Sequence, residues 1–315
     1  MYNQVKVRIF NDIVDLREIN SPVLTIGTFD GVHLGHQKII QALNDEAERC
    51  GGESVLFTFY PHPRMVLYPD AHGLQLIDTQ DEKIEKLQSC GLKNLIIVPF
   101  TFEFSRQTAL EFVRDFLVNQ LNIKTLVIGY DHQFGRNREG DIHFLRETAE
   151  LYGFNVVEIS ALEIEQLNVS STKIREALNT GKVDVARSYL GKPFTLTGKV
   201  TRGNQLGRTI GYPTANIQIE ASEKIIPGNG VYATYVNCRG ERYLGMTNIG
   251  VRPTVVDSGK KTVEVNIFDF AKDIYDEEIQ LEFVSFVRNE QKFEGLDYLK
   301  AQLAADELHV RSVLQ

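Results

Sequence analysis

The chain has 315 residues, of which 43% are hydrophobic and 24% are charged, and its formal net charge is -8. This length exceeds what one hydrophobic core usually organises, so we expect two domains, and the ordinary composition excludes disordered and fibrous proteins. The acidic balance argues against a large basic face, so neither nucleic acid nor an anionic membrane is an expected partner.

The cysteines are few and widely scattered, at Cys50, Cys90 and Cys238, with no CxxC pair. This usage suits a reducing cytoplasm better than a disulfide scaffold or structural zinc. No stretch approaches the roughly 18 apolar residues that a membrane-spanning helix needs, and Met1 to Arg17 already mixes polar and apolar residues. The sequence therefore predicts a cytoplasmic protein.

The first half of the chain alternates short apolar runs with longer stretches of helical spacing. The apolar runs are predicted strands at 23–26, 55–59, 95–98, 126–128 and 156–159. Helical spacing fills the stretch from Ile39 to Ala47 and the ranges 81–90, 108–121 and 141–152. This alternation predicts an α/β domain whose parallel sheet is covered on both faces.

After about residue 192, period-two runs separated by Gly, Asn and Pro replace this pattern. The runs are predicted strands at 195–200, 231–236, 262–268 and 279–286. They predict a small antiparallel barrel or sandwich, with a helix from Leu296 to Leu314 packed on it. Gly191 and Pro193 interrupt a helical stretch at the junction, and we expect one domain over 1–186 and a second over 187–315.

A glycine-bearing turn joins the first predicted strand to an amphipathic helix. Its candidate ligand-binding residues are Gly27, Phe29, Asp30, His33, Gly35 and His36. Such a turn favours an anion, because free backbone N–H groups and the helix dipole both point at it. His33 and His36 are three residues apart and can direct two imidazoles to one place, and Gly35 allows close backbone approach. Chance occurrence and a metal site are alternatives, although no further ligand lies at zinc spacing.

Two further segments place candidate ligands after predicted strands. Ser170, Ser171 and Thr172 precede a helical run and can supply an N-cap and anion-binding N–H groups. Arg175, one turn along, can reach a phosphate, with plain helix capping as the alternative reading of this segment. The segment from Gly129 to Gly135 leaves the fourth strand at the carboxyl edge of the sheet, where open α/β sheets bind ligands.

Glycines recur at about four-residue intervals in the barrel half, with Lys199, Arg202 and Arg208 among them. They suggest a loop whose backbone closes on a ligand, and a flexible barrel loop is the alternative. In the predicted strand 262–268 the alternation turns Glu264 away from the face that Val263 shares with its apolar neighbours. A solvated glutamate is the alternative there.

Taken in order, these motifs resemble the prokaryotic bifunctional riboflavin kinase/FAD synthetase family. His33 to His36 resembles the HxGH signature of nucleotidylyltransferases, and Ser170 to Arg175 resembles their phosphate clamp. The segments Tyr60 to Pro63 and Gly129 to Gly135 are similar to the FAD synthetase branch, with His132 where Phe is frequent. Gly198 to Asn216 resembles the riboflavin kinase signature. Val263 to Asn266 resembles its Glu-x-His pattern, with Asn266 in place of His.

The resemblance implies a Rossmann-like nucleotidylyltransferase domain followed by a riboflavin kinase barrel. Riboflavin and ATP would give FMN, and FMN and a second ATP would give FAD and pyrophosphate. The implied catalytic residues are His33, His36 and the general base Glu264. The other implied ATP contacts of the first domain are Gly27, Phe29, Asp30, Gly35, Asp131, Ser170, Ser171, Thr172 and Arg175.

The resemblance also implies binding residues for flavins, phosphates and Mg²⁺. The FMN contacts of the first domain would be Phe59, Pro61, Pro63 and Phe134. The phosphate contacts of the barrel would be Gly198, Lys199, Gly203, Gly207, Thr214 and Asn216. The barrel flavin would contact Glu264, Asn248 and Arg252. Thr214 and Asn216 would hold Mg²⁺, which favours a few oxygen ligands completed by phosphate and water.

Three other readings stay open at this point. One module alone could be active, with the other as scaffold, or the chain could bind flavin in a regulatory role without consuming ATP. A third reading joins another HxGH enzyme, such as a cytidylyltransferase, to an unrelated barrel.

Overall fold

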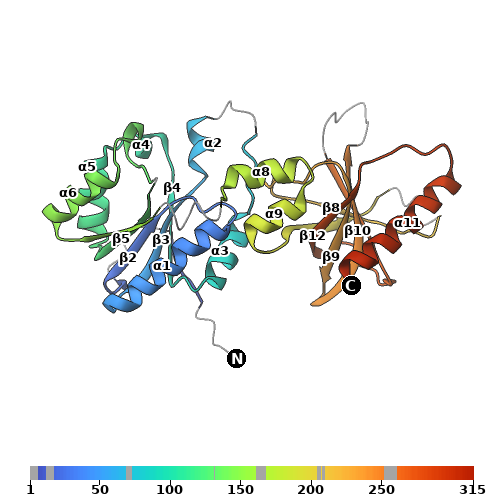
Figure 1. Ribbon diagram of the computed structural model, residues 1–315, viewed down its shortest axis with the longest axis horizontal. Helices are drawn as coiled ribbons and strands as arrows, with labels where there is room; N and C mark the ends of the chain where they lie inside the picture. The colour runs from blue at the N-terminus through green and yellow to red at the C-terminus, as the bar shows by residue number, and fades with distance from the viewer. Residues whose placement is uncertain are drawn as a thin grey trace. The chain divides into compact units, whose positions relative to one another are not determined.

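The computed structural model describes residues 6–11, 18–68, 73–130, 132–160, 168–203, 207, 210–251 and 261–315. The chain divides into two compact units, residues 1–170 and 171–315, and Figure 1 draws both. Helices α8 (Ser171–Asn179) and α9 (Val183–Leu190) group with the second unit, because α9 packs on two of its strands.

A six-stranded parallel sheet forms the centre of the first unit, in the order β1-β4-β3-β2-β5-β6. Its strands are β1 (Arg8–Phe10), β2 (Pro22–Ile26), β3 (Glu53–Tyr60), β4 (Asn94–Pro99), β5 (Thr125–Gly129) and β6 (Asn155–Ile159). The five predicted strands are confirmed as β2 to β6. The sequence missed β1, a three-residue edge strand that pairs with β4 alone.

Helices cover both faces of this sheet, as the sequence predicts (Figure 1). The described helices of this unit are α1 (Leu34–Cys50), α2 (Pro63–Leu67), α3 (Gln80–Ser89), α4 (Phe102–Ser105), α5 (Ala109–Glu111), the π-helix η2 (Phe112–Gln120), the 3-10 helix η3 (Arg136–Arg138) and α6 (Ile142–Tyr152). Successive strand residues point to opposite faces. Val23 therefore packs in a core with α1 and α3, while Leu24 packs in another with η2 and α6.

The second unit is a closed six-stranded antiparallel barrel, in the order β10-β11-β8-β7-β12-β9. Its strands are β7 (Phe194–Thr201), β8 (Ala215–Gln218), β9 (Gly230–Cys238), β10 (Glu241–Val251), β11 (Lys261–Ile267) and β12 (Glu278–Arg288). Helix α11 (Leu296–Leu314) packs on the barrel through Val310 and Leu314. The sequence predicted four of these strands and the helix. It missed β8, which has four residues, and β10, which carries Gly245 and Gly250.

Candidate active sites

The two histidines of the strand-to-helix turn lie ring against ring. His33 caps α1, and its Nδ1 accepts a hydrogen bond from the backbone N–H of His36 at 3.3 Å. The two ring centroids are 3.6 Å apart at an interplanar angle of 14°, and Phe29 stacks on the other side of His36 at 4.5 Å. Phe29 holds a positive φ of 49°. The predicted convergence of the two imidazoles is therefore confirmed, and Phe29 fixes their stack.

His36 is held in its neutral form. Burial lowers the pKa of His36 well below its usual value of 6.5, and the charges of His33 and Lys83 lower it further. Its Nδ1 atom is buried, and no residue in the described part of the chain bonds to it. A neutral imidazole with a free buried nitrogen is poised to hydrogen-bond an incoming ligand.

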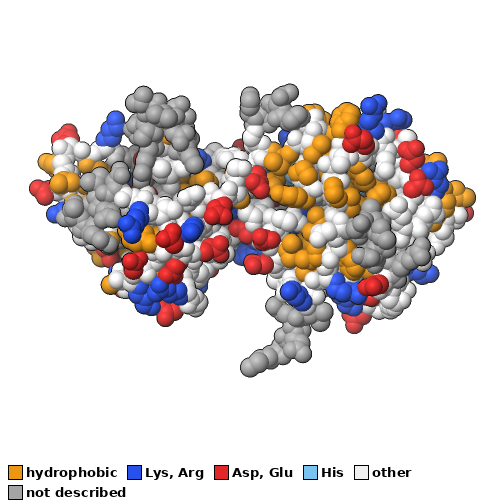
Figure 2. Space-filling view, turned by 180° about the vertical axis from the view of Figure 1, so that it is seen from behind, with side chains coloured by type: hydrophobic (Ala, Val, Ile, Leu, Met, Phe, Trp, Pro, Cys, Tyr) orange, Lys and Arg blue, Asp and Glu red, His pale blue; other side chains and the backbone are white. Residues whose placement is uncertain are grey.

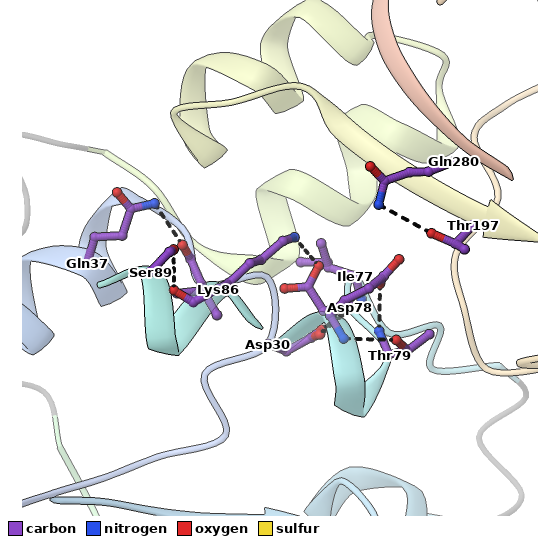
Figure 3. Close-up of polar contacts among 11 residues, drawn as sticks. Asp30, Gln37, Ile77, Asp78, Thr79, Lys86, Ser89, Thr197 and Gln280 are labelled. Carbon is purple, nitrogen blue, oxygen red and sulfur yellow. Dashed lines mark hydrogen bonds and ion pairs between the residues drawn. The ribbon is translucent and has the colours of Figure 1, made fainter. Parts of the chain in front are cut away.

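The turn is tied to the segment that leads into α3. The buried carboxylate of Asp30 accepts hydrogen bonds from the backbone N–H groups of Ile77, at 3.0 Å, and Asp78, at 3.2 Å (Figure 3). Thr79 then opens α3 with a capping box to Glu82. Asp30 therefore has a positioning task in this turn, in addition to the ATP contact predicted for it.

A buried lysine lies behind the same turn. Lys83 is 7% exposed, and its Nζ donates to the carbonyl oxygen of Thr28 at 3.5 Å. Burial lowers the pKa of Lys83 to about 8, against the attraction of Asp30 and Asp78, which raises it. Lys86, one turn along α3, forms a buried ion pair with Asp78 (Figure 3). Sequence reasoning missed Lys83, because a charged α3 sequence reads as a solvated helix surface.

A cavity of about 1310 Å³ opens beside this turn. Gly27 and Thr28 line it together with the predicted FMN residues Phe59, Pro63 and Phe134. Its aromatic wall also contains Phe100, Phe102, Phe104 and Phe112. Phe104 packs against Phe59 at a centroid distance of 5.5 Å. Pro61, also predicted, is exposed and is not among the described lining residues. The Phe100, Phe102, Phe104 spacing directly after β4 was the missed sequence signal.

The described lining of this cavity is basic although the chain is acidic. It includes Arg64, Arg106, Arg136 and Arg138, and no Asp or Glu. Arg138 follows Asn137 in a turn where both residues have positive φ, at 60° and 55°. Figure 2 shows hydrophobic side chains gathered over part of the first unit, at the right of that view. An apolar slot with cationic groups suits a flat aromatic ligand that carries a phosphate.

In the barrel, three of the predicted kinase residues come together across three strands. Asn216 of β8 lies opposite Glu264 of β11, and Glu264 lies opposite Asn248 of β10. A second cavity, of about 400 Å³, is lined by Thr214, Val265, Ile274 and Tyr275 among others. The register brings Glu264 between two amide side chains, and none of these three residues is among those that line the cavity.

The glycine-rich passage begins as a strand. Gly198 and Lys199 lie inside β7, as the strand predicted at 195–200 requires, and not in the ligand-closing loop that the glycine spacing suggested. A Cβ atom at Gly198 would lie 2.6 Å from the carbonyl oxygen of Gln218, so the close approach of β8 explains this glycine. At Gly203 a Cβ would lie 2.0 Å from Nδ2 of Asn216. Gly207 accepts a backbone hydrogen bond from Tyr212 at 2.9 Å.

The remaining predicted residues lie outside the described chain or at the start of α8. Asp131 and Arg252 lie outside the described residues. Helix α8 begins at Ser171, as the hydroxyl run predicts, and Ser170 immediately precedes it. Thr172 is exposed and Arg175 is half-buried. Ser171, Thr172 and Arg175 belong to the second unit.

Comparison with known proteins decides the family. A model described as FAD synthetase matches residues 16–173, and one described as riboflavin kinase matches residues 190–314. The bifunctional riboflavin kinase/FMN adenylyltransferase of Escherichia coli K12 is 40% identical over 92% of this chain and 91% of its own length. This chain belongs to the bifunctional riboflavin kinase/FMN adenylyltransferase family.

Further members and a solved structure agree over nearly the whole chain. The family member from Buchnera aphidicola of Schizaphis graminum is 37% identical over 95% of this chain and 96% of its own. A Streptococcus pneumoniae crystal structure named macrolide-efflux protein has a TM-score of 0.86 and 32% identity, covering 97% of this chain and 99% of its own. Among the described helices of this chain, none is long and apolar enough to cross a membrane.

The two departures from the family pattern now have structural explanations. His132, where Phe is frequent, stacks on Phe134 at a centroid distance of 6.0 Å and keeps an aromatic ring in the cavity wall. Asn266, in place of His, is 7% exposed and donates from Nδ2 to the carbonyl oxygen of Pro213 at 2.6 Å. Asn266 therefore ties down the segment that carries Thr214.

Proposed function

We propose that this chain phosphorylates riboflavin to FMN in residues 187–315 and adenylylates FMN to FAD in residues 1–186, with ATP consumed at both sites. The observation that carries the proposal is the stacked His33–His36 pair at the mouth of a strand-to-helix turn, beside an aromatic cavity lined with arginines. The names of the family members describe the same two reactions.

In the first site, the flavin ring of FMN would lie against Phe59, Pro63 and Phe134. An oxygen of the FMN phosphate attacks the α-phosphorus of ATP, and the bond from that phosphorus to the leaving pyrophosphate breaks. Such a transfer depends on position and charge neutralisation more than on a covalent nucleophile. The arginines of the cavity supply positive charge for the FMN phosphate.

His33 and His36 would stabilise the phosphoryl oxygens as charge develops on them. His36 is neutral in the free protein, so it meets the triphosphate as a hydrogen-bond donor, and the anion then favours its protonation. Gly27, Phe29, Asp30, Gly35 and Asp131 would shape the ATP site around the turn. Ser170, Ser171, Thr172 and Arg175 would hold the departing phosphates, as an exposed helix N-terminus and a guanidinium can.

In the barrel, Glu264 would accept the proton of the terminal ribityl hydroxyl as its oxygen attacks the γ-phosphorus of ATP and ADP leaves. Asn248 and Arg252 would orient the flavin, and Gly198, Lys199, Gly203 and Gly207 would surround the phosphates. The apolar part of the 400 Å³ cavity suits the adenine ring.

Thr214 and Asn216 fit a Mg²⁺ site. Both offer an uncharged oxygen, and the register sets Asn216 opposite the carboxylate of Glu264. Few oxygen donors completed by phosphate and water suit Mg²⁺, and among the described residues no group of His, Cys, Asp and Glu suggests another metal. When bound, Mg²⁺ would neutralise phosphate charge, while Thr214 and Asn216 fix its place.

The test separates the by-products of the two reactions. The full chain is given Mg²⁺ and ATP with either riboflavin or FMN, and ADP and pyrophosphate are measured along with the flavins. With riboflavin we expect ADP, pyrophosphate and FAD, and with FMN we expect pyrophosphate and FAD without ADP. Release of ADP alone from riboflavin, or of pyrophosphate from FMN with neither by-product from riboflavin, would support a single active module. Release of neither by-product with either flavin would refute the proposal.

A further inference from the structure

The turn that carries the histidine pair rests on a buried cation. The Thr28 carbonyl oxygen accepts hydrogen bonds from Lys83 Nζ at 3.5 Å and from the Thr58 hydroxyl at 3.4 Å. Thr28 itself lines the large cavity. Lys83 thus contacts the backbone between Gly27 and Asp30, where the proposed nucleotide site begins.

Two carboxylates and one imidazole lie close enough to Lys83 to interact with its charge. Asp30 and Asp78 attract it, but neither forms an ion pair with it in the described part of the chain, because Asp30 bonds to backbone N–H groups and Asp78 pairs with Lys86. Lys83 is also near enough to His36 to depress the pKa of that imidazole. Keeping the Lys83 ammonium charged in a buried site without a direct carboxylate partner costs free energy. A phosphate that binds nearby offsets this cost.

We propose that Lys83 is a positioning residue for adenylyl transfer, which holds the Thr28 carbonyl and supplies the buried positive charge that the turn uses to receive the nucleotide phosphates. The inference rests on the proposed adenylyltransferase function. It assigns a role in the reaction to a helix that contributes no residue to the HxGH turn.

Because Lys83 loses its proton near pH 8, this role predicts a pH dependence of FMN adenylylation. Its pKa is about 8 in the free protein, so the charge is present at neutral pH and is lost as the pH rises through 8. The value of kcat/KM reports ionisations of the free enzyme. With FMN held well below its KM and ATP varied, kcat/KM should fall about tenfold per pH unit above that point, because only the protonated lysine supports binding. Using FMN as substrate excludes the kinase site from the measurement.

Three variants test the assignment. Lys83→Arg keeps a charge that does not titrate, so the fall above pH 8 should disappear while activity at pH 7 is largely retained. Lys83→Met should lose at least tenfold in kcat/KM for ATP at pH 7. Lys86→Arg, a matched change one turn along the same helix, should keep the alkaline fall of the wild type. Amide hydrogen exchange of the parallel sheet in the same preparations reports that the first unit is folded, because riboflavin phosphorylation reports only the barrel.

Asp30 gives an independent check on the direction of the effect. Its negative charge raises the pKa of Lys83, so Asp30→Asn should move the alkaline fall to lower pH. The proposal is overturned if Lys83→Arg keeps the wild-type fall, or if Lys83→Met has normal kcat/KM for ATP. Failure of the wild-type chain to adenylylate FMN at any pH would instead refute the proposed function.

Discussion

Asp30→Asn is expected to loosen the phosphate turn without changing its shape. In the wild-type protein one carboxylate, 4% exposed, serves the N–H groups of both Ile77 and Asp78 and attracts Lys83. Asn keeps one acceptor oxygen, but it loses the charge and turns an NH₂ group toward the Ile77 donor. Hydrogen bonds to a charged group are worth about 1 kcal/mol more than neutral ones, so two weakened bonds cost about 2 kcal/mol, and loss of the charge that attracts Lys83 adds to this.

Heat inactivation and hydrogen exchange measure this loss. A cost of 2–3 kcal/mol corresponds to a lowering of the melting temperature by roughly 5–10 °C for a unit of this size. We expect FMN adenylylation to be inactivated at lower temperature while riboflavin phosphorylation keeps its wild-type profile, and the amides of Ile77 and Asp78 to exchange faster. Asp45→Asn, an exposed position on α1, is the control. If Asp30→Asn melts and exchanges like Asp45→Asn, the anchoring role is wrong.

Three further changes have distinct expected outcomes. Asn266→Ala removes the buried bond to Pro213, worth about 1–3 kcal/mol, so riboflavin phosphorylation should fall about fivefold or more while FMN adenylylation of the same preparation is unchanged. Phe104→Ala should raise the KM for FMN about tenfold or more by opening the aromatic wall, whereas the exposed Leu151→Ala should not. The folded pKa of His36 lies below its unfolded value near 6.5. Its stabilising effect is therefore present above pH 6.5 and lost as the pH falls below it, by at most about 1.4 kcal/mol per pH unit. In urea titrations His36→Phe should show a shallower loss of stability between pH 7 and 5.5, and an unchanged slope would contradict the buried neutral state.

Sequence patterns predicted elements whose residues share one periodicity. The apolar runs that became β2 to β5 are buried along most of their length, so their hydrophobicity is continuous and easy to recognise. The sequence pattern did not predict strand β10, because its side chains are buried by neighbouring strands of the closed barrel and its sequence contains Gly245, Asn248 and Gly250. The register that sets Glu264 between Asn216 and Asn248 is a tertiary property that the strand sequence alone does not contain.

The site residues likewise separate into those that sequence spacing predicts and those that only tertiary contacts reveal. The spacing of His33 and His36 predicted two imidazoles in one place, but not the Phe29 ring that holds them, since its positive φ depends on the packed turn. Lys83 sits in a run of charged residues that reads as a solvated surface. Only the tertiary contact with the turn buries it, and that burial lowers its pKa.

The most direct test of two independent sites is a reciprocal measurement on two variants of the full chain. Flavins are separated after incubation of each variant with Mg²⁺ and ATP, first with riboflavin and then with FMN. The His33→Ala/His36→Ala double variant should convert riboflavin to FMN and stop there. Glu264→Ala should leave riboflavin unchanged and still turn added FMN into FAD. Normal FAD output from the double variant, or loss of both conversions in a folded Glu264→Ala protein, would contradict the account.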